Sequence, residues 1–415
     1  MAEESEPSNV FPRRRMLDRR EFIAGAGAAV ISFSIMRPEV ARGSEANSKI
    51  ALGMIGCGGR GTWIADLFQQ HGGYEIVAAM DYFPDKVEAF GAKFNVAPER
   101  RYSGLQGYRR MLEGKVDAVA IESPPYFHPE QAAAAVDAGA HVYLAKPVAV
   151  DVPGCRSIEA SSGKATAKNR CFLVDFQTRT DPFYQEAIKR VHNGDIGPIL
   201  CGEAAYWAGS PFLRQLEQLK ADPADPERRL RAWGVDRALS GDIITEQNIH
   251  ALDVATWVMD THPLRATGKG GLKSRAEGNC WDHFSLIFTF PGDVLVTFAS
   301  KQFGAGHDDI LCRMYGAQGT LDTHYAGSVA IRGNVPYEGG TSPDLYKEGA
   351  VRNIATFYDD VTQGRFSNPT TAPSVRSNLT TILGRTAAYK HAEVSWEELM
   401  KSKEKLDPKL HGLKE

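Results

Sequence analysis

The sequence has little cysteine, and its cysteines follow no pairing pattern. Only six occur in 415 residues, and no two of them form a Cys-x-x-Cys arrangement. Zinc frameworks need closely spaced ligands, and small disulfide-stapled folds need a far denser set of cysteines. Both classes are therefore excluded, and the cysteines are interpreted as small buried hydrophobic residues.

The chain also lacks an excess of basic charge and, beyond residue 46, any long apolar run. Its 48 Lys and Arg residues against 51 Asp and Glu residues give a net charge of −3, whereas a dedicated nucleic-acid binder usually carries a basic excess. No stretch there is long and apolar enough for a membrane helix. With 43% hydrophobic and 24% charged residues, the composition is globular, and the length predicts two or three domains.

Residues 1–46 differ from the rest of the chain. Arg19-Arg20-Glu21-Phe22-Ile23 precedes a short apolar run rich in Gly and Ala, and Ser44-Glu45-Ala46 forms a small-residue cleavage pattern. The order of these features resembles a twin-arginine (Tat) export signal. We therefore expect residues 1–46 to be a signal peptide and the mature protein to be periplasmic or extracellular, without stable membrane insertion. Since this route carries folded proteins, a cofactor would be acquired before export and held tightly.

A phosphate-binding motif opens the folded part. The apolar strand 49–55 runs directly into Gly56-Cys57-Gly58-Gly59-Arg60-Gly61, which is followed by a helix pattern over 62–70. In a G-x-G-x-x-G turn, the first Gly permits the tight turn, the second lets the backbone approach a pyrophosphate, and the third lets the helix pack closely. The pyrophosphate then meets the N-terminal amides of the helix.

An acid stands where a dinucleotide ribose would need it. The second strand, 74–80, ends at Asp81, about 20 residues after the last Gly of the motif. A carboxylate there accepts hydrogen bonds from both ribose hydroxyls and repels a 2′-phosphate, and Tyr82-Phe83-Pro84 offers no adjacent Arg. NAD is therefore favoured over NADP.

Strand and helix patterns continue to alternate through residue 176. Buried strand patterns at 116–121, 141–145 and 171–176 are separated by helix patterns at 129–138 and 152–167. Such repetition predicts a doubly wound parallel sheet of the Rossmann type over residues 47–176. Pro124, His128 and Lys146 fall at the carboxyl ends of strands, where ligands bind in these sheets.

Several separate motifs resemble the Gfo/Idh/MocA family (glucose–fructose oxidoreductase, inositol dehydrogenase). They are the glycine turn, the loop 123–128, Ala145-Lys146-Pro147, Arg179 with the helix that ends at 193–198, and Glu246 to Asp253. The resemblance implies that residues 177–415 form an α+β substrate and oligomerisation domain with a large, open, mostly antiparallel sheet. The sequence agrees, because 284–290 and 294–299 alternate around Pro291-Gly292-Asp293 and predict a hairpin.

The chain departs from the family motifs at two positions. Ala145 stands where the family has Glu before Lys-Pro, which removes a carboxylate near Lys146. Glu246 replaces the usual Asp four residues before His250, which keeps the charge and lengthens the side chain. Support for the lysine is therefore expected to come from elsewhere.

The resemblance and the chemistry together assign site residues. His250 is the candidate base, Lys146 polarises the reacting oxygen, and Glu246 is expected one helical turn before His250, where it orients the imidazole or contacts substrate. Arg179, Tyr206 and Trp233 are substrate-side candidates, and no metal site is expected. The predicted cofactor contacts are Gly56, Gly58, Gly59, Arg60, Gly61, Asp81, Ser123, Pro124, His128 and Lys146.

Three functions remain open at this stage. The first is an NAD(P)-dependent oxidoreductase acting on a sugar, glycoside or cyclitol hydroxyl, with tightly bound cofactor and a dimeric or tetrameric homo-oligomer. The second is a glycosidase that works by transient oxidation and elimination. The third is a non-catalytic sugar or NAD sensor, which the presence of Lys146 and His250 disfavours.

Overall fold

The computed structural model describes residues 49–415, so the predicted export signal lies outside the described residues. A six-stranded parallel sheet comes first, in the order β3-β2-β1-β4-β5-β6. The chain reverses its direction of winding between β1 and β4, which is where dinucleotides bind in such sheets. The strands are β1 Ile50–Ile55, β2 Tyr74–Asp81, β3 Arg101–Ser103, β4 Ala118–Ile121, β5 His141–Ala145 and β6 Phe172–Asp175.

Helices connect these strands and cover the sheet. They are α2 Gly59–His71, α3 Pro84–Phe94, α4 Gly107–Glu113, α5 His128–Asp137 and α6 Val152–Ala167. Every residue of β4, β5 and β6 is buried, as expected for a parallel sheet covered on both faces. Asp151 caps α6 by accepting a hydrogen bond from the Gly154 amide, and Pro153 stands in the first turn.

A nine-stranded sheet forms the second layer, in the order β14-β13-β12-β11-β7-β10-β9-β8-β15. Only the β7–β10 pair is parallel within this sheet. The predicted hairpin is confirmed, because β9 and β10 pair antiparallel across the turn 291–293. The strands are β7 Ile199–Ala208, β8 Arg265–Gly271, β9 His283–Phe290, β10 Val294–Gln302, β11 Asp309–Gly316, β12 Gly319–His324, β13 Ser328–Gly333, β14 Tyr337–Thr341 and β15 Val394–Ser395.

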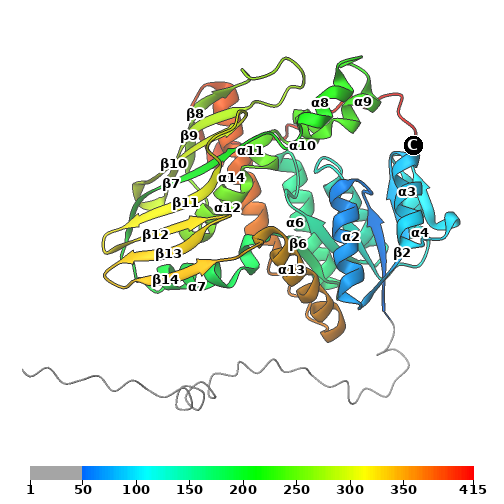
Figure 1. The fold of residues 1–415 in the computed structure, drawn as a ribbon, viewed down its shortest axis with the longest axis horizontal. Coiled ribbons are helices and arrows are strands. Elements are labelled where there is room, and N and C mark those ends of the chain that lie inside the picture. The colour runs from blue at the N-terminus through cyan, green and yellow to red at the C-terminus, as the bar shows by residue number, and fades with distance from the viewer. Residues whose placement is uncertain (1–48) are drawn as a thin grey trace, which may run out of the picture. The chain divides into compact units, whose positions relative to one another are not determined.

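Helices fill the space between the two sheets and add a separate group above the first layer (Figure 1). The longest are α13 and α14. The helices are α7 Pro182–His192, α8 Leu213–Leu219, α9 Pro226–Arg231, α10 Arg237–Ser240, α11 Ile243–Glu246, α12 Ile249–Met259, α13 Leu345–Gln363, α14 Thr371–Lys390 and α15 Trp396–Met400. The predicted α/β fold class, a Rossmann layer followed by a large, mostly antiparallel sheet, is confirmed.

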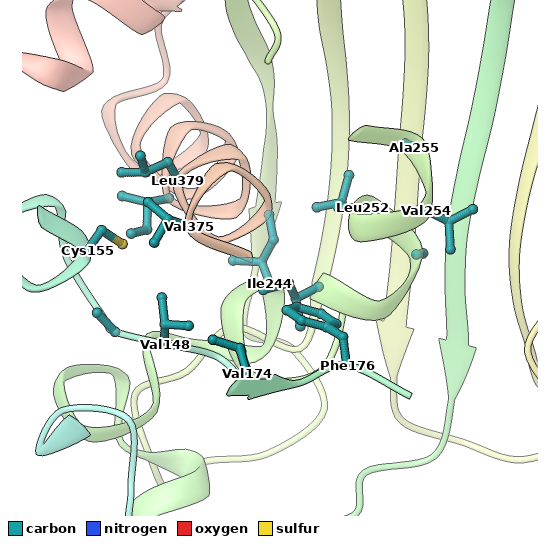
Figure 2. Close-up of a cluster of buried hydrophobic side chains, with 14 of the residues drawn as sticks. Val148, Cys155, Val174, Phe176, Ile244, Leu252, Val254, Ala255, Val375 and Leu379 are labelled. Atoms are coloured by element: carbon teal, nitrogen blue, oxygen red, sulfur yellow. The ribbon is translucent and has the colours of Figure 1, made fainter. Parts of the chain in front are cut away.

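One hydrophobic core runs through both layers. Figure 2 shows Val174 and Phe176 of the first layer meeting Ile244, Leu252 and the α14 side chains Val375 and Leu379. The same buried cluster continues to Phe288 and Phe298 in the second sheet. Residues 49–415 accordingly form one compact unit.

Candidate active site

The glycine turn after β1 has the shape that each of its glycines requires. Gly56 adopts φ +94°, and a Cβ there would lie 2.7 Å from the Glu122 carbonyl carbon. A Cβ on Gly61 would lie 1.8 Å from the Gly56 oxygen, so α2 packs directly on the turn. Gly58 and Gly59, by contrast, face open space. Together with the free amides at the start of α2, this cradle fits a pyrophosphate.

Asp81 is fixed at the end of β2 by the turn itself. Its Oδ2 accepts a hydrogen bond from the Cys57 amide at 2.8 Å, and its Oδ1 accepts one from the Phe83 amide at 3.0 Å. Burial raises the pKa of Asp81, and the two amide bonds oppose this shift. Because each carboxylate oxygen carries two lone pairs, Asp81 can still accept ribose hydroxyls.

A cavity of about 350 Å³ joins these features. One wall consists of Rossmann residues, namely Gly56, Gly58, Gly59, Met80, Asp81, Tyr82, Phe83, Lys86, Leu105, Glu122, Ser123, Pro124, Phe127 and Gln131. The other wall comes from the α8–α9 segment, with Arg214, Gln215, Gln218, Leu230, Arg231 and Trp233. Trp233, predicted on the substrate side, thus lines the same cavity as the cofactor turn.

The α8–α9 segment is attached to the first layer by a salt bridge and an aromatic contact. Arg231 Nη2 lies 3.0 Å from Asp85 Oδ1 at the start of α3, and its guanidinium carbon lies 3.8 Å from the Phe83 ring centroid. The C-terminal residues reach the same place, because the Leu105 amide donates to the Lys414 carbonyl at 2.9 Å. Leu230 and Leu410 pack in the same small cluster as Phe83.

Lysine 146 forms the centre of the buried polar group beyond β5. Its Nζ donates to the Glu246 carbonyl oxygen at 2.7 Å and lies 3.4 Å from Glu246 Oε1. The lysine and the glutamate are 7% and 6% exposed. Burial lowers the pKa of Lys146 and raises that of Glu246, and each opposes the other's shift through its charge. Glu246 therefore gives the lysine the support that Ala145 cannot.

The prediction that a single helix carries both Glu246 and His250 is wrong. Glu246 ends α11, and His250 lies in the first turn of α12, with a break at Gln247 and Asn248. The Gln247 side chain is used locally, since it accepts a hydrogen bond from the Tyr206 hydroxyl at 2.8 Å. The expected orientation of His250 by Glu246 is not seen, because Glu246 turns to Lys146 instead.

His250 lies buried beside Tyr325, with ring centroids 5.1 Å apart. Its Nδ1 and the Tyr325 hydroxyl have no hydrogen-bond partner among residues 49–415. Burial lowers the pKa of His250 well below its usual range, and the charges of Lys146 and Arg60 add to this shift. The imidazole is therefore neutral at neutral pH, and its Nδ1 can form a hydrogen bond with a ligand.

Arg60 binds two carboxylates that sequence reasoning missed. Its Nη2 lies 2.5 Å from Asp175 Oδ2, and its Nε lies 2.9 Å from Glu122 Oε2. Its Nη1 also donates to the Tyr346 hydroxyl. The arginine side chain is thus directed to the ends of β4 and β6, while its backbone remains in the turn that the sequence assigned to the cofactor.

His128 and Ser123 hold the loops next to the cofactor turn. The two ring nitrogens of His128 lie 2.9 Å from the Pro147 oxygen and 2.7 Å from the Ser123 oxygen. Burial lowers the pKa of His128 to about 4. A neutral, fully enclosed ring between these loops positions Pro147 and Ser123 rather than facing the cavity.

Arg179 is occupied by a structural partner. Its Nε and Nη2 donate to the buried Asp253 carboxylate at 2.8–3.1 Å. Its guanidinium carbon lies 5.1 Å from the Trp257 ring centroid. This pair connects the segment after β6 to α12, and it leaves Nη1 of Arg179 as the donor for the predicted substrate contact.

Within the described range, no three His, Cys, Asp or Glu side chains gather as a potential metal site. None of the helices between residues 49 and 415 combines the length and apolar character of a membrane span.

The glycine cradle, Asp81 and the unpaired buried groups do fit a dinucleotide, which Gly56–Gly61 and Asp81 would hold.

Comparisons with known proteins agree with this fit. Residues 50–174 match the Gfo/Idh/MocA oxidoreductase family with its NAD-binding Rossmann fold, and residues 184–322 match the C-terminal domain of the same family. The chain is 22% identical to an inositol 2-dehydrogenase of Rhizobium meliloti over 76% of its length and 89% of that protein. It is 27% identical to glycosyl hydrolase family 109 protein 3 of Phocaeicola vulgatus over 51% of its length and 38% of that protein.

Among solved structures, the fold resembles myo-inositol 2-dehydrogenase from Lactobacillus plantarum. The TM-score is 0.67 at 19% identity, with 84% of this chain and 99% of the other covered. The two family matches are consecutive, and they include the glycine turn, Lys146 and His250. The chain therefore belongs to the Gfo/Idh/MocA family of NAD-binding oxidoreductases.

Proposed function

We propose that the protein is an NAD-dependent oxidoreductase that oxidises a CH–OH group of a sugar, glycoside or cyclitol. The observation that carries this proposal is the placement of Lys146 and Glu246, as a buried pair, and the neutral His250 beyond the strands that form the dinucleotide turn. The names of the relatives, which include inositol dehydrogenases, support a polyhydroxylated ring as substrate.

The chain's own residues can handle the proton of this reaction. The bound nicotinamide supplies a hydride acceptor. His250 is the group that accepts the hydroxyl proton, since its Nδ1 has no hydrogen-bond partner within residues 49–415. Lys146 donates a hydrogen bond from Nζ to the same oxygen and stabilises its growing negative charge. Glu246 orients the ammonium group through its carbonyl oxygen and carboxylate.

Two measurements on the purified protein test this proposal. Mass spectrometry and absorbance of released nucleotide identify the cofactor and show whether it is retained. A screen of sugars and cyclitols at the reduced-nicotinamide band then identifies the substrate. The proposal is contradicted if the protein binds no nicotinamide dinucleotide. It is also contradicted if none of the sugars and cyclitols in the screen reduces the bound nicotinamide.

We also propose that the protein binds its cofactor tightly, is exported and forms a homo-oligomer. The wall that the α8–α9 segment forms over the cavity supports slow release of a nucleotide. The order Arg19-Arg20-Glu21-Phe22-Ile23 supports twin-arginine export to the periplasm. Ile287, Leu295 and Tyr315 expose apolar surface on the large sheet, which supports a homo-oligomer. Fractionation of cells and light scattering of the purified protein test the last two statements.

A redox-neutral glycosidase is the second candidate. The similarity to glycosyl hydrolase family 109 proteins favours it, although the chain spans only 38% of the one compared above. Incubation with aryl glycosides and no added acceptor separates the two functions. Release of the phenol with unchanged total NADH supports the glycosidase, whereas accumulation of NADH without phenol supports net oxidation.

A further inference from the structure

The cavity between the glycine turn and the α8–α9 segment corresponds to one half of a dinucleotide site. Its first-layer residues all lie at or after the carboxyl ends of β1, β2, β3 and β4, and they include Asp81. Lys146, which follows β5, and His250 on α12 do not line it. A dinucleotide crosses this point of the sheet with one nucleoside on each side. The cavity therefore belongs to the nucleoside whose ribose Asp81 meets, which is the adenosine.

The apolar lining of this cavity suits the faces of an aromatic base. Leu105 and Phe127 line it from the first layer, and Leu230 and Trp233 line it from the second. All four side chains belong to one hydrophobic cluster, so the two layers are in contact beside the cavity. A base held between such side chains is recognised through hydrogen bonds to its polar edge.

Helix α8 turns its polar face to the same cavity. Leu216 and Leu219 are buried in a small hydrophobic cluster with the turn that contains Ala232. Arg214 and Gln218, which are four residues apart and so share one side of the helix, line the cavity instead. The second layer thus brings polar side chains to the place where the first layer leaves the base.

Most polar groups of the cavity can satisfy only part of an adenine edge. Adenine presents a donor, its N6 amino group, beside an acceptor, its ring N7, and a glutamine amide can pair with both at once. Lys86, Arg214 and Arg231 only donate, and the ionised carboxylates of Asp81 and Glu122 only accept. The choice is therefore among the three glutamines that line the cavity.

Two of these glutamines are already engaged within the protein. Gln131 Oε1 accepts a hydrogen bond from Ser123 Oγ at 2.5 Å, and Gln215 Oε1 accepts one from the Gly234 amide at 2.9 Å. Among the described residues, only the backbone of Gln218 is engaged, and its side-chain amide keeps both a donor and an acceptor unused. Gln218 is also exposed, which places it at the rim of the cavity, where a base edge would meet solvent.

We propose that the α8–α9 segment recognises the adenine base of the bound dinucleotide, with the Gln218 amide accepting a hydrogen bond from the amino group and donating one to the adjacent ring nitrogen. The cofactor is then held by both layers, the first through its phosphates and ribose and the second through its base. This inference rests on the proposed NAD-binding function and adds a base-reading residue to it.

Titrations of the full-length protein, freed of nucleotide, with NAD⁺ and with nicotinamide hypoxanthine dinucleotide test this assignment. The second compound carries an oxygen in place of the adenine amino group. The wild-type protein is expected to bind NAD⁺ about 5- to 10-fold more tightly, because the analogue loses one hydrogen bond and opposes two acceptors. Gln218→Ala is expected to reduce this ratio to within about twofold, and an unchanged ratio would overturn the proposal.

Two further variants separate base recognition from general effects on the cavity. Arg214→Ala, on the same side of α8, removes a group that only donates and is expected to keep the wild-type ratio. An equal fall of the ratio in Arg214→Ala and Gln218→Ala would overturn the proposal. Gln218→Glu keeps the acceptor, so the preference for NAD⁺ over the analogue is expected to be at least that of the wild type, and its loss would contradict the role of the acceptor.

The outcomes distinguish this inference from the function on which it rests. Because Gln218 is exposed, its variants are expected to fold, and thermal unfolding of each one verifies this. A wild-type protein that binds neither dinucleotide contradicts the proposed function itself. A wild-type protein that binds the two equally tightly contradicts only the recognition of adenine.

Discussion

The two ends of the cofactor cleft differ in whether their buried polar groups have hydrogen-bond partners within the protein. At the β2 end, Asp81 has both oxygens bonded to backbone amides, and the α8–α9 segment forms one wall of the cavity. At the other end, beyond β5, buried polar atoms of Glu246, His250 and Tyr325 have no hydrogen-bond partner within residues 49–415. The first end is satisfied by the protein alone, and the second requires ligands.

This difference shows where the fold gives up stability for function. An unsatisfied buried polar group costs roughly 1–3 kcal/mol, so the second end is maintained by packing elsewhere in the molecule. Ligands that supply the missing partners should therefore raise the melting temperature. The adenosine end, being complete, should mainly set which nucleotide enters and how long it stays.

The largest expected effect comes from the unsatisfied end. Lys146→Ala should lower kcat/KM about 1000-fold, because it removes the donor that stabilises charge on the substrate oxygen. Cofactor affinity should change much less, since the glycine cradle and Asp81 are untouched. Steady-state kinetics with the identified polyol, together with NAD⁺ titration, measures both. Turnover at the wild-type rate would disprove the active-site assignment.

A second substitution tests selectivity at the β2 end. Asp81→Ser should shift the ratio of NADP to NAD affinity about 100-fold toward NADP, because a repelling carboxylate and a charged acceptor are lost together. Lys86, Arg214 and Arg231 already line this cavity and would face the added phosphate. Adding Lys86→Ala to Asp81→Ser should reverse part of the gain, and an unchanged ratio in Asp81→Ser would remove Asp81 from the ribose site.

A pH titration tests Glu122 and Arg60, the buried pair that lies between the two ends. Burial raises the pKa of Glu122 to about 7 against the opposing charge of Arg60. Because the unfolded chain releases this proton near the ordinary pKa of 4.5, the folded protein holds more protons at pH 6. Relative to Glu122→Gln, the free energy of unfolding of the wild type should therefore rise by roughly 1 kcal/mol from pH 8 to pH 6. The charged and titratable groups around Glu122 are Arg60, Asp175, Lys146, Tyr143 and Tyr346.

Urea unfolding of the two nucleotide-free proteins at both pH values measures this change. Glu122→Gln is the reference because it keeps the buried histidines, such as His128 and His250, whose lowered pKa values act in the opposite direction. A difference between the two proteins that stays constant with pH would mean that Glu122 does not titrate in this range.

The smallest effect concerns the attachment of the wall over the adenosine end. Arg231→Ala should speed NAD⁺ release about two- to fivefold, because it breaks a partly exposed ion pair with Asp85 and a contact with Phe83. Rapid displacement of bound cofactor by excess ADP-ribose measures the rate. Lys93→Ala, which breaks an exposed pair with Asp66, should leave the rate unchanged. An equal effect of both variants would mean that the wall does not retain the cofactor.

Sequence patterns predicted the parts of the fold that depend on local periodicity. The helix expected at 152–167 is α6 in full, and the strand expected at 141–145 is β5. The glycine turn was predicted together with the reason for each glycine, and the structure confirms the tight fits at Gly56 and Gly61. These features follow from hydrophobic alternation and steric limits within a few residues.

Contacts between distant segments were not predictable in the same way. The short polar helices α8 and α9 carry no strong apolar period, so their place over the cavity depends on tertiary packing. Glu122 stands directly before Ser123-Pro124 and offered no signal of burial beside Arg60. The break at Gln247 depends on partners such as Tyr206, 41 residues away.

Helix α13 has a consequence for how the chain is made. Its residues Ala350, Ile354 and Phe357 belong to the second buried cluster of the first layer, together with Phe68 of α2 and Tyr143 of β5. The Tyr74 hydroxyl also donates to the Ile354 carbonyl at 2.9 Å. During synthesis, the first layer therefore cannot close its core until α13 has left the ribosome. Until then, the strands synthesised first expose apolar surface to which chaperones can bind. Residues 49–176 expressed alone would lack one wall of their core.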